Sequence, residues 1–320
     1  MSLSPAPFHA ELSEGPAGSS AWWVKTDDGL RIRVAHFPAE QARGTVLLFP
    51  GRTEYVEKYG RTAVDLAARG YHVLSIDWRG QGLADRMLDE PMAGHVHVFQ
   101  DYQQDVAAML TCIDELELPQ PLHLIGHSMG GCIGLHAVMD GLPVESCVFS
   151  GPMWGIRISD SLRPAAWALS WGGKQIGLGH HFAPGTKPKS YILSSEFEGN
   201  LLTRDQEMWD YMRRQVLKVP ELQLGGPSLN WLHEALVETR DLARRASPNL
   251  PCLTFMGTNE RIVDQARVIS RMQHWPGGEL VQVPGGEHEL LMDDVTTRSG
   301  VTNQICAFFD QAGSAFAMRA

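Results

Sequence analysis

Residues 122–131 read Leu-His-Leu-Ile-Gly-His-Ser-Met-Gly-Gly and join a strand-like segment to a helix-like one through a tight turn. Their centre, residues 126–130, has the pattern Gly-x-Ser-x-Gly. Small residues on either side let the turn close, and the turn lifts the Ser128 hydroxyl clear of the strand. The first amides of the helix behind it are free donors near developing negative charge. We therefore expect Ser128 to be a nucleophile, because a turn that served only packing would not need a serine at its apex.

Strand-like and helix-like segments alternate on both sides of this turn. Short apolar or alternating runs predict strands at residues 30–36, 45–49, 72–76, 122–125, 146–150, 253–256 and 280–283. Helical spacing predicts helices at residues 59–69, 99–116, 129–140, 264–272 and 295–311. Repeated strand–helix–strand units predict an α/β fold with a mostly parallel sheet that is flanked by helices on both faces.

The alternation stops between residues 152 and 245. This segment is rich in Trp, Gly, Pro and Met, and it contains helix-like pieces without a clear strand. We expect it to be a helical cap inserted into a core made of residues 25–151 and 246–320. Residues 1–24 are rich in Pro, Gly and Ser and predict a flexible lead-in.

Composition and charge exclude several classes of protein. The 320 residues are 43% hydrophobic, which suits a large core, and the net charge of −10 argues against a nucleic-acid partner. No stretch approaches the roughly 20 apolar residues of a membrane-spanning helix. The first basic residue is Lys25, so we expect no secretory signal. Five scattered cysteines without a C-x-x-C pair predict reduced thiols and a cytoplasmic location.

A serine nucleophile needs a base and a carboxylate that orients the base. The expected base is His288, on the loop after the last predicted strand, where it would face the same crevice as Ser128. Two carboxylates, Glu260 and Asp264, follow the strand at 253–256. We favour Glu260, because Asp264 stands where a helix N-cap is expected. His127 lies inside the turn, and we expect it to have a packing role.

The tetrahedral oxyanion of acyl transfer needs two preorganised donors. We expect these to be the backbone N–H of Met129, directly after the nucleophile, and that of Arg52, where Gly51 allows close approach. The side chains of Arg52 and Glu54 are candidates for binding a polar substrate head. The alternative is that the two form a surface ion pair with each other, worth about 0–1 kcal/mol.

Motifs along nearly the whole chain after about residue 25 resemble a known family. They resemble the lysophospholipase L2 branch of the α/β-hydrolases, which is close to the monoacylglycerol lipases and belongs with the serine aminopeptidase-like hydrolases. The motifs that carry the resemblance are residues 51–56, 77–82, 94–96, 99–102, 126–131, 197–200, 225–228, 231, 260–264 and 288–289. The resemblance implies the α/β-hydrolase fold, a helical cap over the active site, ester hydrolysis without a cofactor, and acyl-glycerol or lysophospholipid substrates.

The chain departs from this family at two places. Pro50-Gly51 stands where many relatives have His-Gly, and Glu260 stands where monoacylglycerol lipases have aspartate. Either carboxylate can orient an imidazole, so the second departure leaves the expected triad intact.

We therefore expect a serine hydrolase of lipid carboxylic esters, a lysophospholipase or monoacylglycerol lipase, that works through Ser128, His288, Glu260 and an acyl-enzyme. We expect no cofactor, and no metal because the histidine pairs at 95, 97 and 180–181 lack further ligands. Trp154 and Trp171 are candidates for lining an acyl pocket, although each could simply pack the cap onto the core.

Other functions remain open on the same residues: a small-ester esterase, an aminopeptidase-type amide hydrolase, a transacylase, or a binding protein without catalysis. An epoxide hydrolase or dehalogenase would need aspartate in place of Ser128. Membrane contact is at most peripheral, because the cap has no Lys/Arg-rich amphipathic helix. The sequence leaves the oligomeric state open.

Overall fold

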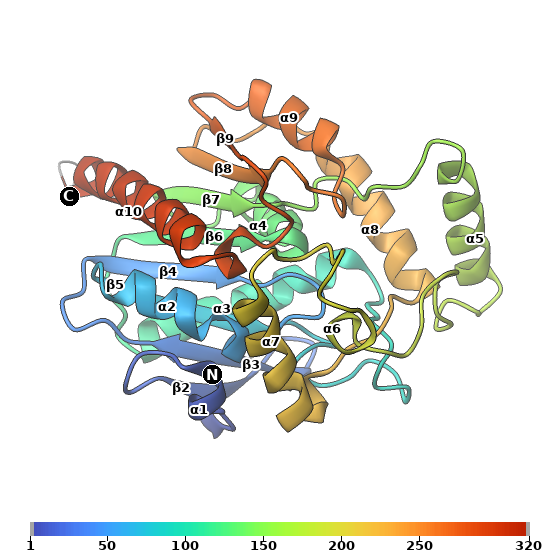
Figure 1. Cartoon of the computed structure of the whole chain (residues 1–320), viewed down its shortest axis with the longest axis horizontal. Helices are drawn as coiled ribbons and strands as arrows, with labels where there is room; N and C mark the ends of the chain where they lie inside the picture. Colours follow the sequence, from blue (N-terminus) through green and yellow to red (C-terminus); the bar gives the residue numbers. More distant parts are fainter. Residues whose placement is uncertain (1–2, 318–320) are drawn as a thin grey trace.

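A nine-stranded sheet runs through the computed structural model, which describes residues 3–317 (Figure 1). The strand order across the sheet is β1-β2-β3-β5-β4-β6-β7-β8-β9. Neighbours from β5 to β9 in this order are parallel, whereas β1, β2, β3 and β5 pair antiparallel. The predicted α/β fold with a mostly parallel sheet is confirmed. The strands are β1(Ser4–Ala6), β2(Ser20–Lys25), β3(Arg31–Phe37), β4(Gly44–Phe49), β5(Tyr71–Asp77), β6(Leu122–His127), β7(Ser146–Ser150), β8(Cys252–Gly257) and β9(Glu279–Val283).

Helices cover both faces of this sheet. On one face lie α3(Tyr102–Glu115), α4(Ser128–Met139) and α9(Gln265–Gln273); on the other lie α2(Gly60–Ala67) and α10(Val295–Ala317). The central strand β4 shows why two cores form. Its side chains alternate in direction, so Leu47 and Phe49 pack into the first core while Val46 and Leu48 pack into the second. The short 3-10 helices are η1(Val56–Tyr59), η2(Phe99–Asp101) and η4(Leu290–Met292).

A helical segment lies between β7 and β8, where we expected the cap. It contains α5(Arg163–Gln175), α6(Tyr191–Ser194), α7(Gln206–Lys218), η3(Pro220–Leu222) and α8(Leu229–Leu242). Figure 1 shows α5 far from the sheet, packed beside α8, whereas α7 lies close to the N-terminal elements. Isolated bridges such as that between Ile156 and Val263 connect the segment to the core.

The expectation of a flexible lead-in at residues 1–24 is wrong for the part that the structure describes, residues 3–24. β1 pairs with β2, and β2 pairs with β3, so both extend the sheet. The intervening helix α1(Ala10–Ser13) ends at the fully buried Ser13. The hydroxyl of Tyr211 on α7 donates to the carbonyl of Ser13 over 2.7 Å, and Gln215 Nε2 donates to that of Leu12 over 2.7 Å. These contacts are distant in sequence, and therefore local composition did not predict the order of this segment.

Within the described residues, no helix has both the length and the apolar character required to span a membrane. The five cysteines are all buried, and none of them forms a disulfide.

Candidate active site

The turn between β6 and α4 has the expected strand–turn–helix context. Ser128 at its apex has φ = +49°, in the left-handed region that costs a non-glycine residue roughly 1–2 kcal/mol. Gly130 must be glycine, because a Cβ there would lie 2.0 Å from the carbonyl oxygen of Phe49. The strained turn is therefore pressed directly against β4, and it holds the serine in a fixed place.

The structure brings together the three side chains that the sequence nominated. His288 Nε2 lies 2.9 Å from Ser128 Oγ, and His288 Nδ1 lies 2.6 Å from Glu260 Oε2. The second oxygen of Glu260 accepts the N–H groups of Ile262 at 2.6 Å and Val263 at 3.1 Å. Ser128, Glu260 and His288 follow β6, β8 and β9, so they meet where the carboxyl ends of parallel strands gather their loops.

Burial and charge act in opposite directions on this pair. Burial favours the neutral form of each residue, but the hydrogen bond and the electrostatic attraction between Glu260 and His288 outweigh this effect. They hold the pKa of Glu260 below its ordinary value and raise the pKa of His288 above its own. The arrangement therefore stabilises an imidazolium beside the serine, which is the species that forms when His288 accepts a proton.

Asp264, the competing carboxylate, has the role that the sequence suggested for it. It is the N-cap of α9, where its side chain accepts the N–H of Arg267 at 3.3 Å. It also lies 3.5 Å from Arg163 Nη2. The helix-cap interpretation is confirmed, and no contact joins Asp264 to His288 among the hydrogen bonds of the described residues.

Residues 50–55, here called the oxyanion loop, lie against the serine: a Cβ on Gly51 would be 3.0 Å from Ser128 Cβ. The Gly51 N–H donates to Glu54, and the Thr53 N–H donates to Gln81 Oε1 over 2.6 Å. Between them, the Arg52 N–H has no partner among the described groups. Met129 lies in the first turn of α4, where amides lack intrahelical acceptors. Both expected donors are thus available for an oxyanion.

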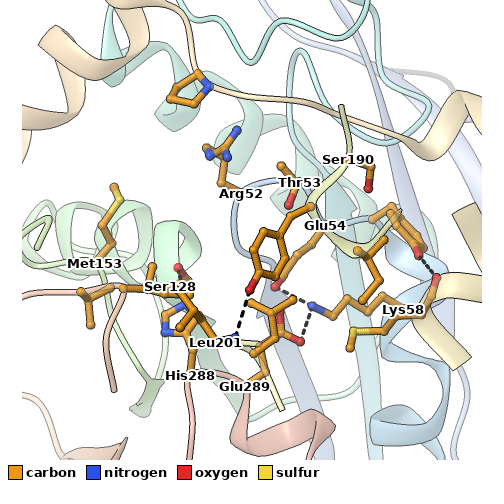
Figure 2. Close-up of a pocket in the computed structure, with 18 of the residues that line it drawn as sticks. Arg52, Thr53, Glu54, Lys58, Ser128, Met153, Ser190, Leu201, His288 and Glu289 are labelled. Atoms are coloured by element: carbon orange, nitrogen blue, oxygen red, sulfur yellow. Dashed lines mark hydrogen bonds and ion pairs between the residues drawn. The ribbon is translucent and has the colours of Figure 1, made fainter. Parts of the chain in front are cut away.

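A cavity of about 360 Å³ opens beside Ser128 and His288 (Figure 2). Most of its wall is apolar and comes from the segment between β7 and β8. Its apolar and aromatic lining residues are Tyr55, Met153, Ile156, Tyr191, Ile192, Leu201, Leu202, Met212, Val216, Leu222, Pro227, Trp231, Leu232, Ile262 and Val263. A volume of this order is typical of a small-molecule site.

One wall of the cavity carries buried charge. Lys58 Nζ lies 2.8 Å from Glu54 Oε1 and 2.7 Å from Glu289 Oε2. Lys58 offsets the effect of burial on Glu54, whose pKa falls to about 2. Possible metal ligands on Glu54, His127 and Glu289 lie within 4.8 Å of one another, but the Lys58 ammonium already takes the place of a cation there. His127 Nδ1 donates to the carbonyl of Ser150 over 2.9 Å, consistent with its expected packing role.

Of the expected substrate-binding residues Glu54, Trp154 and Trp171, the structure places only Glu54 at the cavity. Trp154 is buried outside the cavity, with its Nε1 donating to the Gly131 carbonyl over 3.1 Å, and Trp171 on α5 is 57% exposed. Neither side chain lines the cavity. The sequence could not show this, because the apolar character of a tryptophan does not tell where in the fold it packs. Glu54 does line it, but its oxygens are occupied by protein donors.

The alternative ion pair between Arg52 and Glu54 is also wrong. The Arg52 guanidinium donates to the Gly225 carbonyl over 2.8 Å and lies 5.6 Å from the ring centre of Trp231, while burial lowers its pKa to about 10. Sequence reasoning missed Lys58 and Glu289. The signal that was present was a lysine at position 58 between Tyr55 and Tyr59, and a second acid next to His288.

Comparison with known proteins places this geometry in a family. A sequence model described as "Serine aminopeptidase, S33" matches residues 40–295. The chain belongs to the serine aminopeptidase S33 family. The resemblance inferred from the motifs is thereby confirmed, and the chain is a hydrolase with the α/β-hydrolase fold.

Several relatives are similar to this chain over most of its length. Lysophospholipase L2 of Escherichia coli (strain K12) is 30% identical over 300 residues, which span 90% of this chain and 86% of the relative. A probable lysophospholipase L2 of Haemophilus influenzae is 26% identical over 85% of this chain and 86% of its own length. The crystal structure of a soluble variant of Saccharomyces cerevisiae monoglyceride lipase matches with a TM-score of 0.71 and 20% identity, over 90% of this chain and 94% of that one. At this identity the structural likeness speaks for the fold alone.

Proposed function

We propose that the chain hydrolyses carboxylic esters of lipids, as a lysophospholipase or monoacylglycerol lipase. The observation that carries this is the continuous chain of contacts from Ser128 Oγ through His288 to Glu260 at the edge of an apolar cavity. The lysophospholipase and monoglyceride lipase relatives support the same substrate class.

The reaction follows from the positions of these atoms. Ser128 Oγ attacks the ester carbonyl carbon while His288 Nε2 takes the hydroxyl proton, and a tetrahedral oxyanion forms. When the intermediate collapses, the bond to the alcohol breaks and His288 returns the proton to the leaving oxygen. Water, deprotonated by the same nitrogen, then attacks the acyl-enzyme and releases the carboxylic acid and Ser128.

Glu260 and the oxyanion loop accelerate these reaction steps. Glu260 holds the imidazole with Nδ1 protonated, so that Nε2 faces the serine as an acceptor. The N–H groups of Arg52 and Met129 donate to the oxyanion, and one such donor is worth about 10²–10³ in rate.

The cavity suits a single acyl chain. Its wall is largely apolar and includes Met153, Val216 and Leu222 from the segment between β7 and β8. Exposed apolar side chains around α5 could make a peripheral contact with a lipid surface, and we propose that substrate is taken from there. These side chains are Leu162, Leu169, Trp171, Ile176 and Leu178. The buried free thiols are compatible with a reducing cytoplasm.

A matched substrate panel tests the proposal: lysophosphatidylcholine, a monoacylglycerol, and short and long p-nitrophenyl esters, with Ser128→Ala as the control. We expect turnover of the long-chain lipids that Ser128→Ala abolishes, and the ratio of the two lipids identifies the head group. Turnover of short esters alone would keep the triad but reject the acyl cavity, and would favour a small-ester, amide or transacylase activity. No turnover, together with no labelling of Ser128 by a fluorophosphonate, would reject catalysis altogether.

A further inference from the structure

A buried lysine lies between two loops of the site, and the proton-transfer steps leave it without a task. The Lys58 ammonium is in contact with Glu54 at 2.8 Å and with Glu289 at 2.7 Å, and all three side chains are only 5% exposed. Figure 2 shows the lysine reaching between the two carboxylates at the cavity wall. Three charged groups in such a place are costly to desolvate, and an apolar cluster of the same shape would often be as stable. Stability alone therefore does not explain them.

Each carboxylate holds one loop of the site. Glu54 belongs to the oxyanion loop, and its second oxygen accepts both the Gly51 N–H and the Tyr59 hydroxyl, the latter at 2.6 Å. It thereby fixes the amide directly before Arg52. Glu289 belongs to residues 284–289, here called the histidine loop, and directly follows His288. Lys58 is therefore connected through Glu54 to the loop that carries the Arg52 amide, and through Glu289 to the loop that carries His288.

The lysine has a rigid base of its own. It lies on η1, where the Val56 N–H donates to Asp77 Oδ1 over 2.8 Å. The neighbouring Glu57 forms a fully buried pair with Arg33 at 2.7 Å, and Arg33 also bonds Asp77 at 2.7 Å. η1 is therefore fastened to the sheet, and the ammonium is a fixed point for both loops.

The cluster does not take part in proton transfer. Both ring nitrogens of His288 are occupied, one by Glu260 and the other by Ser128. Lys58 can therefore act on the reaction only indirectly, through the positions of the two loops or through its charge.

We propose that Lys58 is a positioning residue, which ties the oxyanion loop to the histidine loop and keeps the Arg52 amide and the His288 ring at a fixed separation during acyl transfer. The inference rests on the proposed ester-hydrolase function and extends it. A displacement of about 1 Å between reacting groups can cost about 100-fold in rate, so a loose connection between these loops would be felt in turnover.

Two variants and one control test whether Lys58 holds the two loops in place. Lys58→Met removes the ammonium but leaves two carboxylates facing each other, which endangers folding. The triple variant Glu54→Gln, Lys58→Met, Glu289→Gln leaves no unpaired charge, and its glutamine oxygen can still accept from Gly51. Lys174→Met is the control, because Lys174 pairs with Glu234 at 2.5 Å away from the cavity lining.

We expect kcat for a p-nitrophenyl ester to fall about 10- to 100-fold in both Lys58 variants, with KM nearly unchanged and Lys174→Met like wild type. The fluorophosphonate labelling rate of Ser128 should fall by the same factor. A lysine that served only stability would lower Tm and leave kcat per folded molecule intact.

The pH profile separates position from charge. The charged and titratable groups facing His288 are Glu260, Glu289, Glu54 and His127. Lys58→Met makes this surrounding more negative, so the acid limb of kcat/KM moves to higher pH. The triple variant removes the cluster's net negative charge, so the limb moves to lower pH. A lost tie lowers the high-pH plateau in both, whereas a purely electrostatic role would move the limb and spare the plateau.

Amide hydrogen exchange decides the question without reference to activity. We expect faster exchange at residues 50–55 and 284–289 in both Lys58 variants and not in Lys174→Met. Wild-type exchange at these loops, or a wild-type plateau in the folded triple variant, would overturn the proposal. If the wild-type protein hydrolyses no ester and is not labelled by the fluorophosphonate, the proposed function is overturned instead. The hydrogen-exchange result would still show whether Lys58 connects the two loops.

Discussion

Glu260→Gln removes one charge from the site and preserves its shape. In the structure, one carboxylate oxygen accepts the N–H of Ile262 at 2.6 Å and the other binds His288 Nδ1 at 2.6 Å. Glutamine has only one oxygen. If that oxygen keeps the backbone bonds, its NH₂ group faces Nδ1 and forces the imidazole into the tautomer with the proton on Nε2. That nitrogen can then no longer accept the proton of Ser128.

The magnitude follows from this tautomer. Loss of the orienting carboxylate in a serine triad lowers kcat by about 10⁴, which corresponds to roughly 5.5 kcal/mol of transition-state stabilisation. The pH profile should change as well. Glu260 raises the pKa of His288, and the base works only when neutral, so the wild-type acid limb lies above the ordinary histidine value near 6.5. Without the charge, the limb moves to lower pH.

Steady-state kinetics on a p-nitrophenyl ester across neutral and mildly acidic pH measure both effects. Asp264→Ala is the matched control, since this carboxylate lies on the same stretch of chain but caps α9. We expect it to lose about 1 kcal/mol of stability and to keep its turnover. A Glu260→Gln enzyme within about tenfold of wild type, or an inactive but folded Asp264→Ala, would refute the assignment of the acid.

Three further substitutions probe the fold and the cavity. Gly130→Ala places a Cβ 2.0 Å from the carbonyl oxygen of Phe49, and Tm should drop by the equivalent of about 3 kcal/mol or more; an unchanged Tm would show that the turn does not press against β4. Val216→Phe narrows the cavity, so kcat/KM should fall more for long than for short acyl esters, and an equal fall for both would place the acyl chain elsewhere. Trp154→Phe removes the bond to the Gly131 carbonyl at a cost of about 1 kcal/mol in thermal unfolding; a changed chain-length preference would contradict its position outside the cavity.

The parts that the sequence could predict are those set by local rules. The spacing around Ser128 names the strand, the turn and the helix at once. A parallel sheet brings the loops after its strands to one edge, so His288 and Glu260 could be nominated although they lie far from Ser128 in the chain. Asp264 could be set aside because capping is a local property.

The parts that failed depend on contacts between distant segments. Trp154 and Trp171 are candidates for the acyl pocket on size and apolar character alone, with packing of the cap as the alternative. Only the tertiary packing decides that Trp154 is buried against Gly131 and Trp171 is exposed on α5. The position of Lys58 depends on its ion pair with Glu289, which lies more than two hundred residues later in the chain. The order of residues 3–24 comes from pairing with β3 and from α7, neither of which has a signature within the segment itself.

The bond between Tyr211 and Ser13 has a practical consequence for anyone trimming this chain. The helix that carries Tyr211 also supplies Met212 and Val216 to the cavity wall, and Gln215 on it holds Leu12. A proteolytic nick or an N-terminal deletion that reaches Ser13 would remove no residue of the cavity, yet it would release one of its walls. Preference among acyl chain lengths, rather than the rate on short esters, is the property in which such damage would first be noticed.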